Sequence, residues 1–310
     1  MGTTTLESPA VVTPVVRRRR KKYGGLNAWL FALPALAVYL IFLVYPAFTS
    51  VWFSFTDWDG LSPSYNVVGL QNYLEMPKDP VVIQAVINNI IWTIVTIFFP
   101  VVIGLALAML LNGKVRGKPV LRLLFYTPCV LPLVAIASIW GWLYNPQYGA
   151  INEFLRLIGL GSLAQPWLGQ DSTALAAVMV PAIWLRVGFP MLLYLAALQG
   201  INTDMYEAAT VDGATKSQQF WHITMPSLRP AHYIVLALSL IDSFKVFDLI
   251  YAMTYGGPGT ATQVMGTWMY FNVFQYYQAG YGTAIAVVIT IVAIAVSIPY
   301  VRSQTKEHAV

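Results

Sequence analysis

Long apolar stretches separated by short polar ones dominate the chain. Six of the stretches are long enough to cross the hydrocarbon core of a bilayer as an α-helix, which takes about 20 residues. They are residues 28–55, 86–111, 123–144, 173–198, 231–255 and 283–301. The pattern predicts an all-α polytopic membrane protein with six transmembrane helices.

Composition agrees with this prediction, and charge gives the orientation. The 310 residues are 57% hydrophobic and only 10% charged, whereas about a quarter of the residues of a soluble domain are charged. Most of the 18 Lys and Arg residues lie in the two end segments and in the loops after the second and fourth spans. The positive-inside rule places those segments, and hence both termini, in the cytoplasm. The net charge of +5 therefore reflects orientation in a lipid bilayer and does not indicate a nucleic-acid partner.

The ends of the chain differ from its apolar body. Residues 1–26 are polar, contain six consecutive basic residues (17–22) and are predicted to form a disordered cytoplasmic tail. The apolar stretch that follows is too long for the core of a signal peptide, so we expect an uncleaved first span. Residues 27–302 form the predicted six-helix domain, and 303–310 a second cytoplasmic tail. We find no duplicated half, which argues against an inverted-repeat transporter.

The polar loop 200–230 has the pattern of two helices joined by a turn. Two capping pairs and two helix-ending residues define it: Asp204 with Glu207, Gly213, Thr215 with Gln218, and Pro226. One interpretation is a solvated connector or a helix lying flat on the membrane surface. The other is a folded docking element for a partner.

Part of this loop resembles the EAA loop of permease subunits of ATP-binding-cassette (ABC) importers, E-A-A-x3-G-x9-I-x-L-P. The matching residues are Glu207, Ala208, Ala209, Gly213, Ile223 and Pro226, and Met225 stands in place of the Leu. The resemblance implies the type I importer permease fold and a cytoplasmic docking site for an ABC ATPase. It also implies a second permease subunit, as a heterodimer, and an extracytoplasmic solute-binding protein.

A second stretch, SFKVFDLIYAMTYGGPGTAT (residues 243–262), resembles the signature of the carbohydrate family of these permeases, and VGLQNYLEM (68–76) is similar to a G-L-x-N-Y stretch of sugar permeases. The resemblance covers the chain from about Trp29 onward. It implies import of a mono-, di- or oligosaccharide, or of a related polyol, across a bacterial or archaeal cytoplasmic membrane. Which sugar, which second permease, and whether this subunit holds a substrate site are open.

Four charged residues fall inside predicted spans: Arg186 in the fourth, and Asp242, Lys245 and Asp248 in the fifth. Each costs about 2.5–3.5 kcal/mol at the bilayer centre, so each needs a partner or a watery cavity. In a continuous helix Lys245 would neighbour both acids at i,i+3 spacing. We predict a neutral lattice between the fourth and fifth helices, with Arg186 as the cross-helix partner. It serves either the substrate pathway or packing alone, and both interpretations remain open.

The resemblance implies further pathway positions, namely Trp184, Gly188, Met191 and Ser243, with Cys129 and Leu133 on the third span. Most are apolar, which weakens the case for a deep sugar site in this subunit. Five aromatic residues have two interpretations, sugar stacking or anchoring at the membrane interfaces: Trp140, Trp142, Tyr144, Trp184 and Trp268. Two external turns, around Pro146 and at Gly256–Pro258, are candidate docks for the binding protein.

The chain contains no nucleotide-binding motif of its own. Residues 113–119, GKVRGKP, are one residue short of a Walker A loop between the glycines and lack its Ser or Thr. A single Cys and three scattered His residues form no metal-ligand set. We therefore predict no catalytic residues, no metal and no cofactor on this chain, with ATP and magnesium on the partner ATPase. The alternative function is a secondary transporter or channel that uses Asp242, Lys245 and Asp248; an intramembrane enzyme is disfavoured because no nucleophile–base pair exists.

Overall fold

The computed structural model describes the backbone of residues 25–307 and the side chains of residues 30–297. The predicted tails 1–26 and 303–310 lie outside the described residues, apart from 25–26 and 303–307. Secondary structure in the described part is helical, with a single isolated β-bridge between Thr56 and Val67. The all-α prediction is confirmed. The chain divides into two compact units, residues 1–49 and 50–310.

The first predicted span is one run of helix. Helix α1 (Gly25–Tyr39), a π-helical turn (Leu40–Val44) and α2 (Tyr45–Phe53) follow one another without a gap. The wider π turn ends two residues before Pro46. A proline ring clashes with the carbonyl four residues earlier in a regular helix, and widening the turn relieves the clash.

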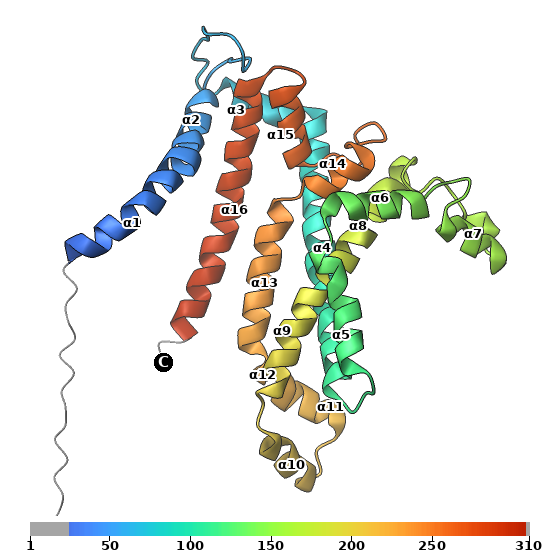
Figure 1. Ribbon diagram of the computed structural model, residues 1–310. Helices are drawn as coiled ribbons and strands as arrows, with labels where there is room; N and C mark the ends of the chain where they lie inside the picture. The colour runs from blue at the N-terminus through green and yellow to red at the C-terminus, as the bar shows by residue number, and fades with distance from the viewer. Residues whose placement is uncertain (1–24, 308–310) are drawn as a thin grey trace, which may run out of the picture. The chain divides into compact units, whose positions relative to one another are not determined.

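Helix α4 (Pro80–Asn112) is the longest element of the second unit, at 33 residues. It follows α3 (Gln71–Glu75) and a 3₁₀ turn (Met76–Lys78), and it begins where Asp79 accepts a hydrogen bond of 2.8 Å from the Val81 amide. It packs against α8, α9 and α13 (Figure 1). Gly104 makes the close approach to α9 possible, because a Cβ there would lie 2.7 Å from the Pro190 Cβ.

The third predicted span is bent. Helix α5 (Lys118–Tyr126) continues through a 3₁₀ turn (Thr127–Val130), and α6 (Leu133–Leu143) then departs at an angle of 102°. Pro132 immediately precedes α6 in an extended conformation, which ends the hydrogen-bond ladder of the preceding helix. The loop between the third and fourth predicted spans then carries a short helix, α7 (Ala150–Leu157), and a 3₁₀ turn (Gly161–Leu163).

The fourth and fifth predicted spans each contain two helices. Helix α8 (Asp171–Arg186) passes into α9 (Gly188–Gln199) at Val187, whose backbone is itself in the helical region, so that residues 171–199 form one span. After the loop helices described below, α13 (Arg229–Phe244) stops before Lys245, and α14 (Asp248–Thr254) begins three residues later. The continuous helix predicted over 231–255 is therefore wrong, and the i,i+3 spacing of Lys245 and Asp248 is lost with it.

The last part of the chain contains α15 (Met265–Phe274), a short helix before the final span, and α16 (Ala279–Glu307). By length and apolarity, four helices of the described residues can cross a membrane, or five with the bent third span. The predicted number of six is thus not confirmed, since α13 alone has only 16 residues.

The turn between α14 and α15 is fastened to α4 by polar groups. Buried Asn88 donates from Nδ2 to the carbonyls of Ala261 (2.9 Å) and Gln263 (2.7 Å), and the Asn89 Oδ1 accepts from the Met265 amide at 2.8 Å. The turn begins with two left-handed residues, Tyr255 and Gly256, and contains a cis Gly257–Pro258 bond. The hydrogen bonds of Asn88 and Asn89 therefore hold the end of this turn and the start of α15 against α4.

Candidate functional site: an intramembrane cavity and a helical loop

The four charged residues of the fourth and fifth spans line one cavity of about 560 Å³. Helix is interrupted at 245–247, and the side chains of Asp242, Lys245 and Asp248 lie exposed on either side of this break or within it. Apolar residues of the third span and of α8–α9 complete the lining. The full set is Cys129, Leu131, Leu133, Leu185, Arg186, Phe189, Pro190, Leu238, Ser239, Asp242, Lys245 and Asp248.

These charges do not form the predicted ion-paired lattice. The only ion pair of 4.0 Å or less among the described side chains is Arg156–Glu153, in the outer loop. Arg186 instead donates from Nη1 to the Ala182 carbonyl at 3.5 Å, and its guanidinium lies 6.0 Å from the ring centre of Trp92. The break in the fifth span also places Asp242 and Asp248 in different helices, α13 and α14.

The structure places two of the other pathway candidates on this cavity and the rest outside its lining. Cys129 and Leu133 line it, and the Cys129 Sγ donates to the Leu185 carbonyl at 2.9 Å. Ser243 is buried with its hydroxyl bonded to the Leu240 carbonyl, and Met191 is buried in the core between α4 and α9. Gly188 is a packing position, because a Cβ there would lie 2.7 Å from the Phe125 carbonyl oxygen.

Trp184 also lies outside the cavity lining. Its ring meets that of Trp140 edge to face, with centres 6.0 Å apart, and 39% of its surface is exposed. Tyr144 packs tilted against Trp140 at 5.5 Å, and its hydroxyl donates to the Ala177 carbonyl at 3.0 Å. The Nε1 of Trp268 donates to Asp79. Among the five aromatic candidates, Tyr144 and Trp268 therefore have clear structural roles.

The loop 200–230 folds into the predicted helix–turn–helix. Helix α10 (Thr203–Val211) ends at Gly213, whose φ of +80° is left-handed, and α11 (Lys216–Gln219) opens with the predicted capping box of Thr215 and Gln218. The first cap differs from the prediction. Asn202, rather than Asp204, caps α10 by accepting from the Asp204 amide at 3.0 Å.

The end of the second helix also differs from the prediction. A π turn (Phe220–Thr224) and α12 (Met225–Ser227) continue the helix past Pro226 as far as Ser227. As before Pro46, the widened turn accommodates the proline ring, so the proline does not stop the helix.

Buried polar contacts hold the two arms of the loop together. The Tyr206 hydroxyl lies 2.8 Å from the Thr224 hydroxyl, and the buried Gln219 donates to the Thr210 hydroxyl at 2.8 Å. The outward side is different. Glu207, Ala208, Gly213 and Pro226 are exposed, whereas Ala209 and Ile223 are half-buried.

Three large apolar side chains are also exposed on this loop, although it lies between spans. They are Met205 (49% exposed), Val211 (88%) and Trp221 (61%). A notch of about 370 Å³ adjoins them, lined by Ala209, Asp212, Gly213, Ala214, Gln218, Gln219, His222 and Ile223. Large exposed apolar side chains on a polar loop outside the spans are candidates for contact with a partner. The sequence motif did not reveal these three residues, which become visible only once the arms are folded.

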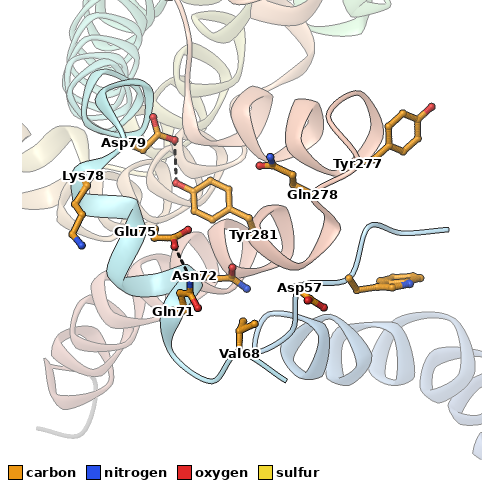
Figure 2. Close-up of a pocket in the computed structure, with 11 residues that line it drawn as sticks. Asp57, Val68, Gln71, Asn72, Glu75, Lys78, Asp79, Tyr277, Gln278 and Tyr281 are labelled. Carbon is orange, nitrogen blue, oxygen red and sulfur yellow. Dashed lines mark hydrogen bonds between the residues drawn. The ribbon is translucent and has the colours of Figure 1, made fainter. Parts of the chain in front are cut away.

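A second polar cavity, of about 530 Å³, lies near the start of α4 and α16 (Figure 2). Its carboxylates have structural partners. Asp79 accepts from the Tyr281 hydroxyl and from Trp268 Nε1, both at 3.0 Å, and Glu75 accepts from Gln71 at 2.9 Å. Asn72 fastens the preceding loop by donating to the Ser54 and Thr56 carbonyls. This cavity is built by groups that hold the loop 54–79 onto the helices.

Comparison with known families identifies the chain. Residues 100–305 match the family described as binding-protein-dependent transport system inner membrane component. The chain belongs to this family. It is 39% identical to the probable ABC transporter permease protein YurN of Bacillus subtilis (strain 168), over 87% of this chain and 93% of that protein. It is 32% identical to the trehalose/maltose transport system permease protein MalF of Thermococcus litoralis, over 94% of this chain and 96% of that protein.

Solved structures confirm the permease fold. A chain of a bacterial ABC transporter involved in the import of the acidic polysaccharide alginate superimposes with a TM-score of 0.78 at 23% identity, covering 91% of this chain and 96% of that chain. The members of this family are permease subunits that work with a separate ATPase. The present chain is accordingly a multi-pass membrane transport subunit of an ABC importer and not an enzyme.

Proposed function

We propose that this chain forms half of the translocation pathway of an ATP-driven importer of a sugar or related polyol, and that it docks an ATPase through loop 200–230. Support for the sugar comes from the relatives, which include permease proteins named for trehalose and maltose, for multiple sugars and for diacetylchitobiose. A second permease subunit completes the pathway as a heterodimer. A solute-binding protein delivers the sugar at the outer turns near Pro146 and Gly256–Pro258.

The observation that carries the docking proposal is the loop with a bonded inner side and an exposed outer side. Buried hydrogen bonds keep the two arms rigid, so the exposed residues keep their positions without a partner. Glu207 supplies a charged contact, and Met205, Val211 and Trp221 supply apolar area next to the notch around Gly213. A short helical element placed in a groove of the ATPase is an established mode of recognition. ATP and magnesium are then bound by that partner.

The pathway proposal rests on the charges of the central cavity. If these charged residues served packing alone, they would form ion pairs with one another, since unpaired charges inside the membrane are costly. Arg186, Asp242, Lys245 and Asp248 instead face a common space without such pairs. Sugars carry many hydroxyl groups, each of which can both donate and accept a hydrogen bond. They can therefore donate to carboxylates and accept from ammonium and guanidinium groups at the same site.

Orientation follows from the basic segments. Loops 112–122 and 200–230 lie on the cytoplasmic side of a bacterial or archaeal cytoplasmic membrane, together with both termini. This orientation requires an even number of membrane crossings. Six crossings result if the interrupted fifth span crosses the membrane once. In it the central cavity lies between the ATPase dock and the outer turns.

The test uses the double replacement Asp242→Asn with Lys245→Met, which keeps the cavity neutral. The variant and wild-type chains are purified with their ATPase and second permease, and uptake is measured for maltose, trehalose and diacetylchitobiose. We expect normal assembly and at least a tenfold loss of uptake of the transported sugar. Normal uptake by the variant would assign these charges to packing. Failure of an ATPase to copurify with the wild-type chain would refute the docking proposal.

A further inference from the structure

Six aromatic side chains gather into one continuous surface beside the central cavity, which we name the aromatic wall. Phe247, Tyr251 and Tyr255 come from the fifth span, and Tyr270, Phe271 and Phe274 come from α15. The ring centres of neighbours lie 5.1 Å apart for Phe247–Tyr251 and for Tyr251–Tyr270, and 4.8 Å apart for Tyr251–Tyr255. No member of this set is among the aromatic residues selected from the sequence.

The wall begins at the cavity and leads toward the Gly-Gly-Pro turn. Phe247 immediately precedes α14, Tyr251 lies within it and Tyr255 immediately follows it, and the ring of Tyr251 contacts the rings of both others. Asp248, which lines the cavity, is the first residue of that helix. Tyr255 is the last residue before Gly256. The rings thus occupy the stretch of chain between the residue that lines the cavity and the Gly-Gly-Pro turn.

Some rings of the aromatic wall are exposed, and one is buried beneath them. Tyr255 is 49% and Phe274 62% exposed, whereas Phe271 is buried behind them. The Tyr251 hydroxyl interacts with the hydroxyls of Tyr255 and Tyr270, and Gln275 donates to the Tyr255 hydroxyl. The site thus offers flat apolar faces together with a small number of hydrogen-bonding groups that the protein holds in place.

This combination matches a pyranose ring, which has apolar C–H faces and a hydroxyl rim. Flat aromatic faces pack against the C–H face, and placed hydroxyl, amide and carboxylate groups fix the orientation. An aromatic belt at a membrane interface differs in one respect, because its rings direct their polar ends toward water and lipid headgroups. Here the tyrosine hydroxyls are directed to one another.

We propose that the aromatic wall is a sugar-stacking site at the outer mouth of the cavity, where a pyranose ring binds before it reaches Asp248. The proposal rests on the proposed function, because it requires that the chain transports a sugar. It adds a location, a ligand class and an order of contacts, with the wall preceding the charged cavity.

The test compares loss of the ring with loss of the hydroxyl. The paired variants are Tyr251→Leu and Tyr251→Phe, and Tyr270→Leu and Tyr270→Phe, each in the assembled importer in proteoliposomes. The probe is the sugar among maltose, trehalose and diacetylchitobiose that the wild-type complex takes up. We expect about a tenfold rise in KM for each Leu variant and a change within about twofold for each Phe variant.

Phe98→Leu and Phe99→Leu are the matched controls, since both rings are exposed on α4, touch each other edge to face and lie outside the cavity lining. Equal KM values for wild type and both Leu variants would overturn the stacking site while leaving the proposed function intact. The same holds if the Phe98 and Phe99 controls raise KM as much, because an interfacial belt would do so. A wild-type complex that transports none of the three sugars would instead contradict the sugar assignment itself, and this inference with it.

Discussion

Replacement of Gly213 by alanine tests whether the turn of loop 200–230 must keep its observed shape. The residue has a φ of +80°, and a Cβ built there meets no atom within 4 Å. The change therefore introduces backbone strain without a steric clash. A left-handed conformation costs a residue with a side chain about 1–2 kcal/mol.

That strain favours other turn conformations by a factor of roughly 5–30, since about 1.4 kcal/mol corresponds to tenfold. If the ATPase binds only the observed turn, its apparent affinity for the permease falls by the same factor. We expect a matching loss of copurified ATPase and of ATP-driven uptake at limiting ATPase concentration. Gly213→Asn should recover much of both, because asparagine tolerates the left-handed region better than other residues.

Gly117 provides a matched control for this experiment. It has a φ of +76°, a Cβ there also meets nothing within 4 Å, and it lies in the other basic loop. Gly117→Ala therefore introduces the same strain away from the docking residues. Equal ATPase binding by the Gly213→Ala and Gly117→Ala complexes, both at the wild-type level, would refute the assignment of the turn to docking.

Three further predictions concern the packing and the outer loop. Gly104→Ala should destabilise the chain by about 1–3 kcal/mol, because its Cβ would lie 2.9 Å from the Met191 backbone nitrogen. Thermal unfolding in detergent measures this loss. Gly141→Ala is the control, since a Cβ there meets nothing within 4 Å. Asn88→Ala should cost about 1–3 kcal/mol, because the carbonyls of Ala261 and Gln263 lose a buried donor; an unchanged midpoint in the same assay would contradict it. Hydrogen bonds from the Ser62 side chain and from the backbone amides of Ser62 and Leu61 lower the pKa of Asp59 from 3.8 to about 2. The turn 59–62 should therefore be fully stabilised above pH 3.8 and lose that stabilisation as pH falls toward 2. Hydrogen exchange at the Leu61 and Ser62 amides measures this change. The Asp59→Asn variant should show no such pH dependence.

Sequence patterns predicted the helical, membrane-spanning class and the folded loop because both depend on local rules. Apolar run length sets the spans, and Thr215, Gln218 and Gly213 have the caps and the left-handed turn that their residue types favour. The prediction that Pro226 ends the helix was wrong, because the rule that proline ends a helix does not consider a preceding π turn that accommodates its ring.

The cavity was only partly predictable. The cost of burying Arg186, Asp242, Lys245 and Asp248 indicated that they share a space, and the structure brings them together. The break at 245–247 was not visible in the apolar pattern, because residues 231–255 contain no Pro or Gly that would mark an interruption. The aromatic wall was missed for a different reason, since its members lie in or beside α14 and in α15 and meet only after the turn between these helices has folded.

Energy coupling is the most direct test of the proposed function. The complete importer, with this chain, its second permease and its ATPase, is placed in proteoliposomes with the binding protein outside, and uptake of maltose, trehalose and diacetylchitobiose is followed. We predict accumulation of one of these sugars that requires ATP at the ATPase face and persists after a protonophore and a sodium ionophore collapse the ion gradients. Uptake by this chain without the ATPase, driven by a proton or sodium gradient, would contradict the proposal.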